Sequence, residues 1–274
     1  MSDTLTASSP GLHTHFDEGI LTISLDAPER GNTLTREMVS AFVDLLQRVA
    51  LNASVRVVVV QGSGADFSRG LDIESFTLRL DGDTPSVRTA LECLHQWRSR
   101  PLSLLPQPVI GLVRGACQGA AIRLIEGCDL VLANDEAQFM MTAHDASVLA
   151  HHPACVPGPD WMDANTLHRL CQPGHVFSGQ EAARHGLITR SCAPDALEQE
   201  VRELARAFVD KDPLALQFTK ETVAYVGCME WDAAVNFTAA KFAELKSRQA
   251  GSASARASGV SNFLAGKSKP GLGG

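Results

Sequence analysis

Residues 115–121 read Gly-Ala-Cys-Gln-Gly-Ala-Ala, and this run of small residues decides the fold. The apolar run at residues 109–113 precedes it and predicts a buried strand. Small residues allow the chain to turn sharply after the strand and to begin a helix close to it. The first turn of a helix presents unpaired backbone N–H groups and the positive end of the helix dipole. Pointed at a carbonyl oxygen that becomes negative during a reaction, such a turn supplies half of an oxyanion hole.

A second strand and loop of the same kind lie upstream. Residues 57–60 are four consecutive valines, which predict a strand because β-branched side chains favour extended backbone. A Gly-rich loop follows and leads into the pattern Phe-Ser-x-Gly-x-Asp at residues 67–72. A lone Gly-rich turn carries little information, since most such turns are only turns. The pair of strand–loop units is more specific.

The two units together resemble the crotonase (enoyl-CoA hydratase/isomerase) superfamily, and the resemblance covers nearly the whole chain. Residues 28–32 are similar to its N-terminal Pro-x-x-x-Asn segment, and residues 179–187 to its Gly-x-x-Ala-x-x-x-Gly-Leu element. The tail at residues 263–272 looks like the end of the feruloyl-CoA hydratase-lyase branch. The resemblance implies an α/β fold, a crotonase-like ββα spiral core with a C-terminal helical trimerisation region.

We expect the chain to have three parts: a disordered N-terminus at 1–11, the spiral core at 12–195, and a C-terminal helical region and tail at 196–274. The C-terminal helices are expected outside the α/β core, and the resemblance implies a homotrimer or dimer of trimers. Periodicity and capping residues predict the individual elements. These are strands at 13–16, 20–25, 57–60, 109–113 and 130–133, and helices near 35–49, 86–97, from 119, and at 197–209, 213–226 and 231–247.

Composition excludes several classes of protein. The formal net charge of −7 and the lack of a long basic run argue against nucleic acid as a partner. No apolar stretch reaches the ~20 residues of a membrane span, and the polar N-terminus lacks the apolar core of a signal peptide. The seven scattered cysteines form no Cys-x-x-Cys pair, which favours reduced thiols in a cytoplasmic protein.

The resemblance places the two oxyanion N–H groups on the backbone of Leu71 and Ala120. The usual Gly-Gly-Gly of the family is Gly-Ala-Ala at residues 119–121 here. Alanine keeps the N–H but disfavours positive φ, so the hole depends on the shape of this turn. The alternative is that both loops are only tight strand-to-helix turns.

The catalytic side chains of the family are replaced in this sequence. Its hydratases use two glutamates, and the feruloyl branch adds a tyrosine on a late helix. The matching positions hold Arg123, Ala143 and Ala239. Adding water to a double bond needs one group that accepts a proton and one that gives it. The standard hydratase mechanism therefore does not fit.

A cluster of four titratable residues follows Ala143 and could replace the missing carboxylates. His144, Asp145, His151 and His152 lie within nine residues. An imidazole with a pKa of about 6.5 can take or give a proton at neutral pH, and a carboxylate can orient it. The alternative is a group of solvated loop histidines. Their spacing matches no zinc pattern and the family uses no metal, so no metal site is expected.

Arg123 is unusual in an acyl pocket, because a buried guanidinium needs an anion. Glu126 or Asp145 could supply that anion as a structural partner. Alternatively, Arg123 binds a substrate carboxylate with two hydrogen bonds. That reading suits a carboxylated acyl thioester and decarboxylation or C–C cleavage through an enolate.

The resemblance also suggests contacts to coenzyme A, which would be part of the substrate rather than a separate cofactor. Arg30 stands where relatives contact phosphate, and Phe263 and Lys267 resemble C-terminal residues that touch the nucleotide; the alternative is that each is an ordinary surface residue.

Two hypotheses remain for the function of the protein. The first is an enzyme acting on an acyl-CoA or acyl-carrier thioester by hydration or dehydration, isomerisation, decarboxylation or retro-Claisen cleavage. The second is a catalytically inactive binding or partner subunit.

Overall fold

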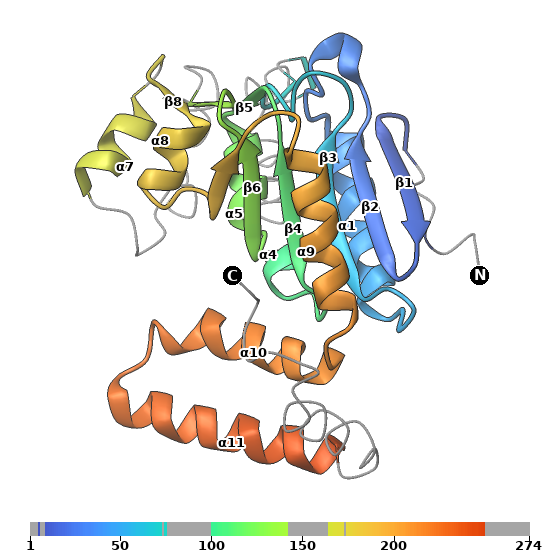
Figure 1. The fold of residues 1–274 in the computed structure, drawn as a ribbon, viewed down its shortest axis with the longest axis vertical. Helices are drawn as coiled ribbons and strands as arrows, with labels where there is room; N and C mark the ends of the chain where they lie inside the picture. The colour runs from blue at the N-terminus through green and yellow to red at the C-terminus, as the bar shows by residue number, and fades with distance from the viewer. Residues whose placement is uncertain are drawn as a thin grey trace, which may run out of the picture.

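The computed structural model describes Leu5 and residues 9–72, 74–75, 100–141, 164–172 and 174–249. Within these residues, two sheets form the centre of the molecule (Figure 1). The large sheet has the order β1 (Leu12–Asp17), β2 (Ile20–Leu25), β3 (Val57–Gly62), β4 (Val109–Val113), β6 (Leu130–Asn134) and β9 (Arg190–Cys192). The small sheet has the order β5 (Ala116–Gln118), β7 (Gln138–Met140) and β8 (Val176–Ser178).

In the described part of the chain, helices and the 3-10 turn η2 connect and cover these strands (Figure 1). They are η2 (Pro28–Arg30), α1 (Arg36–Ala50), α4 (Arg100–Ser103), α5 (Ala120–Glu126), α7 (Ala164–Cys171), α8 (Gly179–Arg184), α9 (Leu197–Val209), α10 (Pro213–Val226) and α11 (Trp231–Gln249).

The large sheet is parallel except for its first hairpin. β1 and β2 pair antiparallel, from Leu12 opposite Leu25 to Asp17 opposite Ile20. The pairs β2–β3, β3–β4, β4–β6 and β6–β9 are all parallel. Parallel strands need crossovers and are covered on both faces, which explains why β3 begins with four buried valines instead of an alternating pattern.

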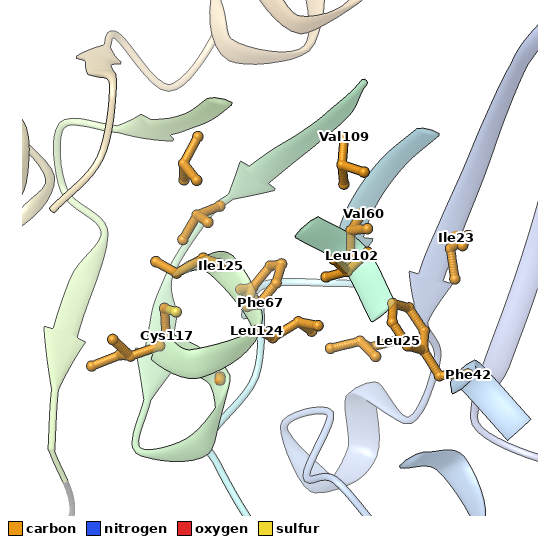
Figure 2. Close-up of a cluster of buried hydrophobic side chains, with 14 of the residues drawn as sticks. Ile23, Leu25, Phe42, Val60, Phe67, Leu102, Val109, Cys117, Leu124 and Ile125 are labelled. Atoms are coloured by element: carbon orange, nitrogen blue, oxygen red, sulfur yellow. The ribbon is translucent and has the colours of Figure 1, made fainter. Parts of the chain in front are cut away.

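One face of the sheet packs on α1 and α5. The contact is a hydrophobic cluster. It includes four fully buried strand residues: Leu21, Ile23, Val58 and Val60. Figure 2 shows how it continues around Phe67, where residues from the strands meet those of α5. The cluster reaches Cys117, so the core lies directly beneath the turn at residues 115–121. Burial of this kind stabilises by roughly 25 cal/mol per Å² of apolar surface.

The opposite face is covered by α9, which differs from our expectation that the C-terminal helices lie outside the core. Leu197, Val201 and Ala205 are spaced four residues apart, form one stripe and are buried. They pack against strand residues that include Val59 and Leu112. Of the three C-terminal helices among the described residues, α10 and α11 extend away from the large sheet (Figure 1).

Most predicted elements are confirmed. The hairpin, the strands at 57, 109 and 130, and both ends of the helices at 197–209 and 213–226 are as expected, while the last helix continues to Gln249. Thr35 caps α1, since its Oγ1 accepts a hydrogen bond from Met38 N–H. The three-residue strands β5, β7, β8 and β9 were not predicted, because such short runs show no periodicity. The predictions at residues 86–97 and for most of 1–11 lie outside the described residues, and the division into three parts remains a prediction.

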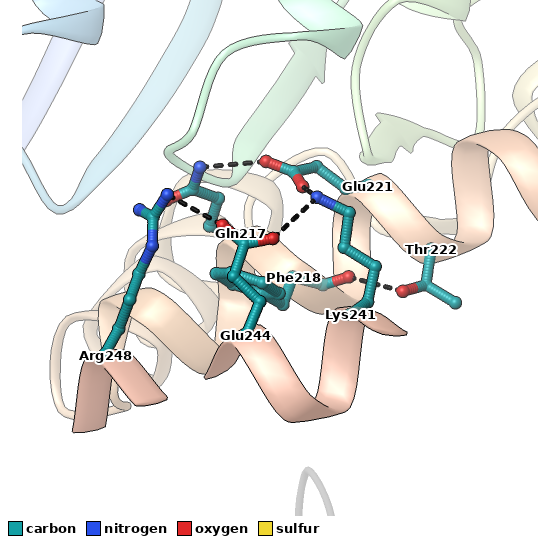
Figure 3. A network of polar contacts seen from close by, with 7 residues as sticks. All are labelled: Gln217, Phe218, Glu221, Thr222, Lys241, Glu244 and Arg248. Atoms are coloured by element: carbon teal, nitrogen blue, oxygen red, sulfur yellow. Dashed lines mark hydrogen bonds and ion pairs between the residues drawn. The ribbon is translucent and has the colours of Figure 1, made fainter. Parts of the chain in front are cut away.

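A buried lysine attaches α10 to the core. Lys220 Nζ donates to the carbonyl oxygens of Leu102 (2.9 Å) and Gln107 (3.1 Å) and to Asp129 Oδ2 (2.7 Å). Burial lowers the pKa of Lys220, and the charge of Asp129 opposes that shift. Burial likewise raises the pKa of Asp129. A second network of ion pairs, centred on Lys241, then joins α10 to α11 (Figure 3).

The substitution Lys220→Met removes this attachment while keeping the length of the side chain. We expect the free energy of unfolding to fall by about 2 kcal/mol, because two carbonyl groups and a carboxylate that is 30% exposed lose their donor. Urea denaturation measures the loss. Lys211→Met, at an exposed lysine in the loop before α10, is the control. Equal stability of the two variants would contradict the role assigned to Lys220.

Candidate active site

Two loops that are far apart in the sequence run side by side at the carboxyl ends of β3 and β4. Ser68 N–H donates to Ala116 O (2.9 Å), and Gln118 N–H donates to Ser68 O (2.9 Å). These bonds form a parallel bridge between Ser68 and Cys117. Leu71 and Ala120 each follow three residues after a bridge residue. The bridge therefore fixes the register of the two peptides that are candidate oxyanion donors.

The turn before α5 has its positive φ at Gly119. Gly119 has φ 53° and ψ −120°, a backbone conformation that glycine tolerates and other residues avoid. Ala120 and Ala121 already belong to the helix. Within the described chain, positive φ at residues other than glycine occurs only at Glu18 and Asn32. Ala120 and Ala121 therefore do not have the positive φ that alanine disfavours. Gly119 N–H donates to Met140 O (2.9 Å), which fixes the turn to β7.

The Leu71 peptide is positioned by Leu34. Leu34 N–H donates to Gly70 O (2.8 Å), and Asp72 N–H donates to Leu34 O (2.9 Å). In this parallel bridge the groups that bond to Leu34 belong to Gly70 and Asp72, the two neighbours of Leu71. The N–H of Leu71 itself therefore points away from Leu34. Gly70, with φ 95°, makes the sharp turn that allows this arrangement.

Asn32 anchors the Gly-rich loop after β3 through hydrogen bonds of its side chain. Its Oδ1 accepts from Ala27 N–H (2.9 Å), and its Nδ2 donates to Ser63 O (2.9 Å) and Asp66 O (2.8 Å). The side chain is fully buried, and the backbone has φ 53°, which asparagine tolerates better than most residues. The Pro-x-x-x-Asn segment thus determines where the Gly-rich loop begins.

Asn32→Gly and Asn32→Ala separate the two roles of this residue. Both remove three hydrogen bonds, so we expect each to lower the free energy of unfolding by about 3 kcal/mol. Alanine should cost about 1 kcal/mol more than glycine, because it is strained at positive φ. Asn32→Asp should be the least stable, since it points a carboxylate oxygen at two carbonyl oxygens. Chemical denaturation of the three variants checks this order; a variant Asn32→Ala as stable as Asn32→Gly would contradict it.

Arg123 is paired with Glu126. Its Nη1 lies 2.8 Å from Glu126 Oε2, and only 3% of the Arg123 side chain is exposed. Of the two structural partners considered from the sequence, Glu126 is therefore present. Asp145 lies outside the described residues, as do Ala143, His144, His151 and His152.

Arg30 stands at the rim of the Leu71 loop. It lies 3.4 Å from Glu29 and 3.9 Å from Asp72, and its side chain is half exposed. Phe263 and Lys267 belong to the part of the chain that is not described. In the described part of the chain, no group of three or more His, Cys, Asp or Glu side chains could hold a metal ion.

The thiol of Cys117 is a packing group. It is fully buried, and burial raises the pKa of this thiol well above its usual range. Burial likewise raises the pKa of Cys128, at the end of α5, to about 12. Both side chains are therefore neutral at physiological pH and are poor nucleophiles.

A groove of about 660 Å³ lies on the other face of the sheet, beside α9. Its lining includes His13, His15 and Arg202 and none of the predicted site residues. The groove exists because α9 leaves the outer part of the β1–β2 hairpin uncovered, and polar side chains there face solvent. No described helix is long and apolar enough to cross a membrane.

Comparison with known proteins identifies the family. Residues 15–264 match the sequence family described as enoyl-CoA hydratase/isomerase. The chain belongs to this family. It is 25% identical over 259 residues to a hydroxycinnamoyl-CoA hydratase-lyase of Pseudomonas fluorescens, covering 94% of this chain and 93% of that protein. It is 26% identical over 215 residues to a 1,2-epoxyphenylacetyl-CoA isomerase of Escherichia coli, covering 77% and 80%.

A solved structure confirms the fold expected from the enoyl-CoA hydratase/isomerase family. The crystal structure of an enoyl-CoA hydratase from Bacillus anthracis superposes with a TM-score of 0.81, at 21% identity, covering 95% of this chain and 98% of that one. The hydratase-lyase among the relatives agrees with the branch suggested by the tail.

Sequence reasoning missed Asp66. Its carboxylate accepts from Ala116 N–H (2.9 Å) and from Arg69 Nε (2.8 Å), and so joins the two loops. No motif marks this aspartate, because the pattern Phe-Ser-x-Gly-x-Asp begins one residue later, at Phe67. The only signal was its position beside the motif.

Proposed function

We propose that this protein is an enzyme that acts on an acyl thioester, with coenzyme A as the carrier, and stabilises an enolate. The N–H groups of Leu71 and Ala120 would receive the negative charge that develops on the thioester oxygen. The observation that supports this proposal is the Ser68–Cys117 bridge, because it holds the two loops that carry Leu71 and Ala120 side by side. One such donor typically contributes about 100- to 1000-fold in rate.

Proton transfer is assigned to His144, Asp145, His151 and His152. Arg123 is unsuited to this role, since its buried guanidinium is held in an ion pair with Glu126. Hydratase-lyase chemistry is the first reaction to test, because a relative along 94% of the chain is a hydroxycinnamoyl-CoA hydratase-lyase. Decarboxylation and retro-Claisen cleavage pass through the same enolate and remain open.

The carrier and the assembly are part of the same proposal. Arg30, Phe263 and Lys267 would contact coenzyme A. A homotrimer or dimer of trimers is the assembly that the family resemblance implies, and the exposed apolar side chains of α10 and α11, such as Val223 (74% exposed) and Trp231 (80% exposed), support an interface there. The cytoplasmic location remains a prediction from the composition. Large apolar side chains at such exposure are typical of a protein interface.

A catalytically inactive partner subunit is the second candidate. It is favoured by the Arg123–Glu126 ion pair, which occupies the place where the resemblance puts a catalytic glutamate. This candidate predicts thioester binding without turnover.

The variant Ala120→Pro tests the oxyanion hole directly. Proline is well tolerated at the first helical position, and it removes one backbone N–H. We expect kcat with an aryl-enoyl-CoA to fall about 100- to 1000-fold, as for the loss of one oxyanion donor. Steady-state kinetics give the loss, and thermal unfolding shows that the fold is kept. Full activity in a well-folded variant would remove Ala120 from the site.

The variants His144→Ala and His151→Ala test the proton-transfer residues. We expect at least one of them to bind a non-hydrolysable acyl-CoA like the parent protein and to lose turnover of aryl-enoyl-CoA or malonyl-type thioesters. Calorimetry gives the affinity and product analysis gives the turnover. Binding without turnover in the parent protein would support the inactive subunit, and absence of binding would exclude coenzyme A.

A further inference from the structure

Asp66 is a half-buried carboxylate that contacts both loops of the candidate site. Its side chain is only 16% exposed. One oxygen accepts the N–H of Ala116 at 2.9 Å, across fifty positions of sequence. The main-chain oxygen of the same residue accepts from Asn32 Nδ2 at 2.8 Å. The residue is therefore fixed at its backbone by the N-terminal segment and fixes the second loop with its side chain.

The second loop lies against Asp66 without room for adjustment. Gly115 has φ 56°, and a Cβ added there would come within 2.6 Å of Asp66 Oδ1. Such an atom would also lie 2.2 Å from Ala65 O. Gly115 O in turn accepts from Gln138 N–H (2.8 Å), so the turn is held from both sides. The glycine is required because φ is positive and because the backbone oxygen of Ala65, together with the Asp66 carboxylate, leaves no space for a Cβ.

Arg69 orients the other carboxylate oxygen. Its Nε donates to Asp66 Oδ2 at 2.8 Å, although 60% of the Arg69 side chain is exposed. The aliphatic part of Arg69 lies over Gly31, where a Cβ would come within 2.5 Å of Arg69 Cδ. An exposed ion pair contributes little to stability. Its effect here is geometric, since it keeps one oxygen free to face Ala116.

We propose that Asp66 is a positioning residue that sets the separation of the two oxyanion donors. It acts through Ala116, four residues before Ala120, while its own loop carries Leu71 five residues later. The proposal rests on the proposed function, because it assumes that both N–H groups contact the thioester oxygen. A displacement of about 1 Å between groups that act together can cost on the order of 100-fold in rate.

The variants Asp66→Ala and Asp66→Asn separate geometry from charge. Alanine removes the acceptor for Ala116 N–H, whereas asparagine can keep it with its side-chain oxygen. We expect Asp66→Ala to lower kcat for an aryl-enoyl-CoA 10- to 100-fold with KM changed less than about threefold, and Asp66→Asn to restore most of the rate. Glu198→Ala is the matched control, because it removes a carboxylate that pairs with Arg114 (2.8 Å), directly before the same turn.

A spectroscopic readout distinguishes positioning from loss of fold. The carbonyl stretch of a ¹³C-labelled thioester bound to the protein reports the hydrogen bonds to its oxygen. We expect its shift to lower frequency to shrink in Asp66→Ala and to remain in Asp66→Asn and Glu198→Ala. Hydrogen exchange of the Ala116 amide should be faster in Asp66→Ala alone.

The outcomes separate this proposal from the proposed function. If the parent protein turns over the thioester and Asp66→Ala matches Glu198→Ala in kcat and carbonyl frequency, the positioning role is wrong. If Asp66→Ala and Asp66→Asn lose activity equally while their carbonyl frequencies are unchanged, it is also wrong. If the parent protein neither binds nor turns over any thioester, the proposed function fails, and the positioning role that depends on it fails for that separate reason.

Discussion

The parallel bridge between Ser68 and Cys117 is the contact on which the candidate site depends. Strands β3 and β4 are neighbours in the sheet, but their loops leave the sheet and could diverge. Two backbone hydrogen bonds keep them together beyond the ends of the strands. Since backbone groups make these bonds, the arrangement places few demands on side chains. It can therefore persist in a chain with other side chains at the positions where the resemblance places the catalytic glutamates.

The residues around the bridge form a frame with two different kinds of constraint. Asn32 satisfies three backbone groups at the base of the first loop and so fixes its origin. Gly70, Gly115 and Gly119 supply backbone conformations that other residues avoid. Hydrogen bonds specify where the loops lie, and the glycines allow them to be there. The apolar core beneath, which includes Cys117, resists any collapse of the frame.

Much of the fold could be predicted from the sequence because long segments carry a clear period. The valines of β3 and the stripe Leu197–Val201–Ala205 of α9 define a strand and a helix by themselves. Whether α9 covers the sheet or leaves it depends on which surface remains open, and that is a tertiary property. The three-residue strands are too short to show a hydrophobic period, and the sequence of β5 is typical of a turn. Leu71 and Ala120 could be predicted as oxyanion donors because motifs surround them. Asp66 stands outside every motif, and only its contacts with Ala116 and Arg69 reveal its role in joining the loops.

The burial of Cys117 gives the frame an internal reporter. A neutral thiol enclosed by the core, at the residue that pairs with Ser68, cannot meet a dissolved alkylating reagent while the two loops are closed. Its modification requires the core around it to open, whereas the exposed thiol of Cys228 is accessible throughout. The ratio of the two labelling rates therefore measures how often the core beneath the loops opens in the native protein, independently of any substrate. Cys117, a packing residue, thus serves as a probe of local opening at the site.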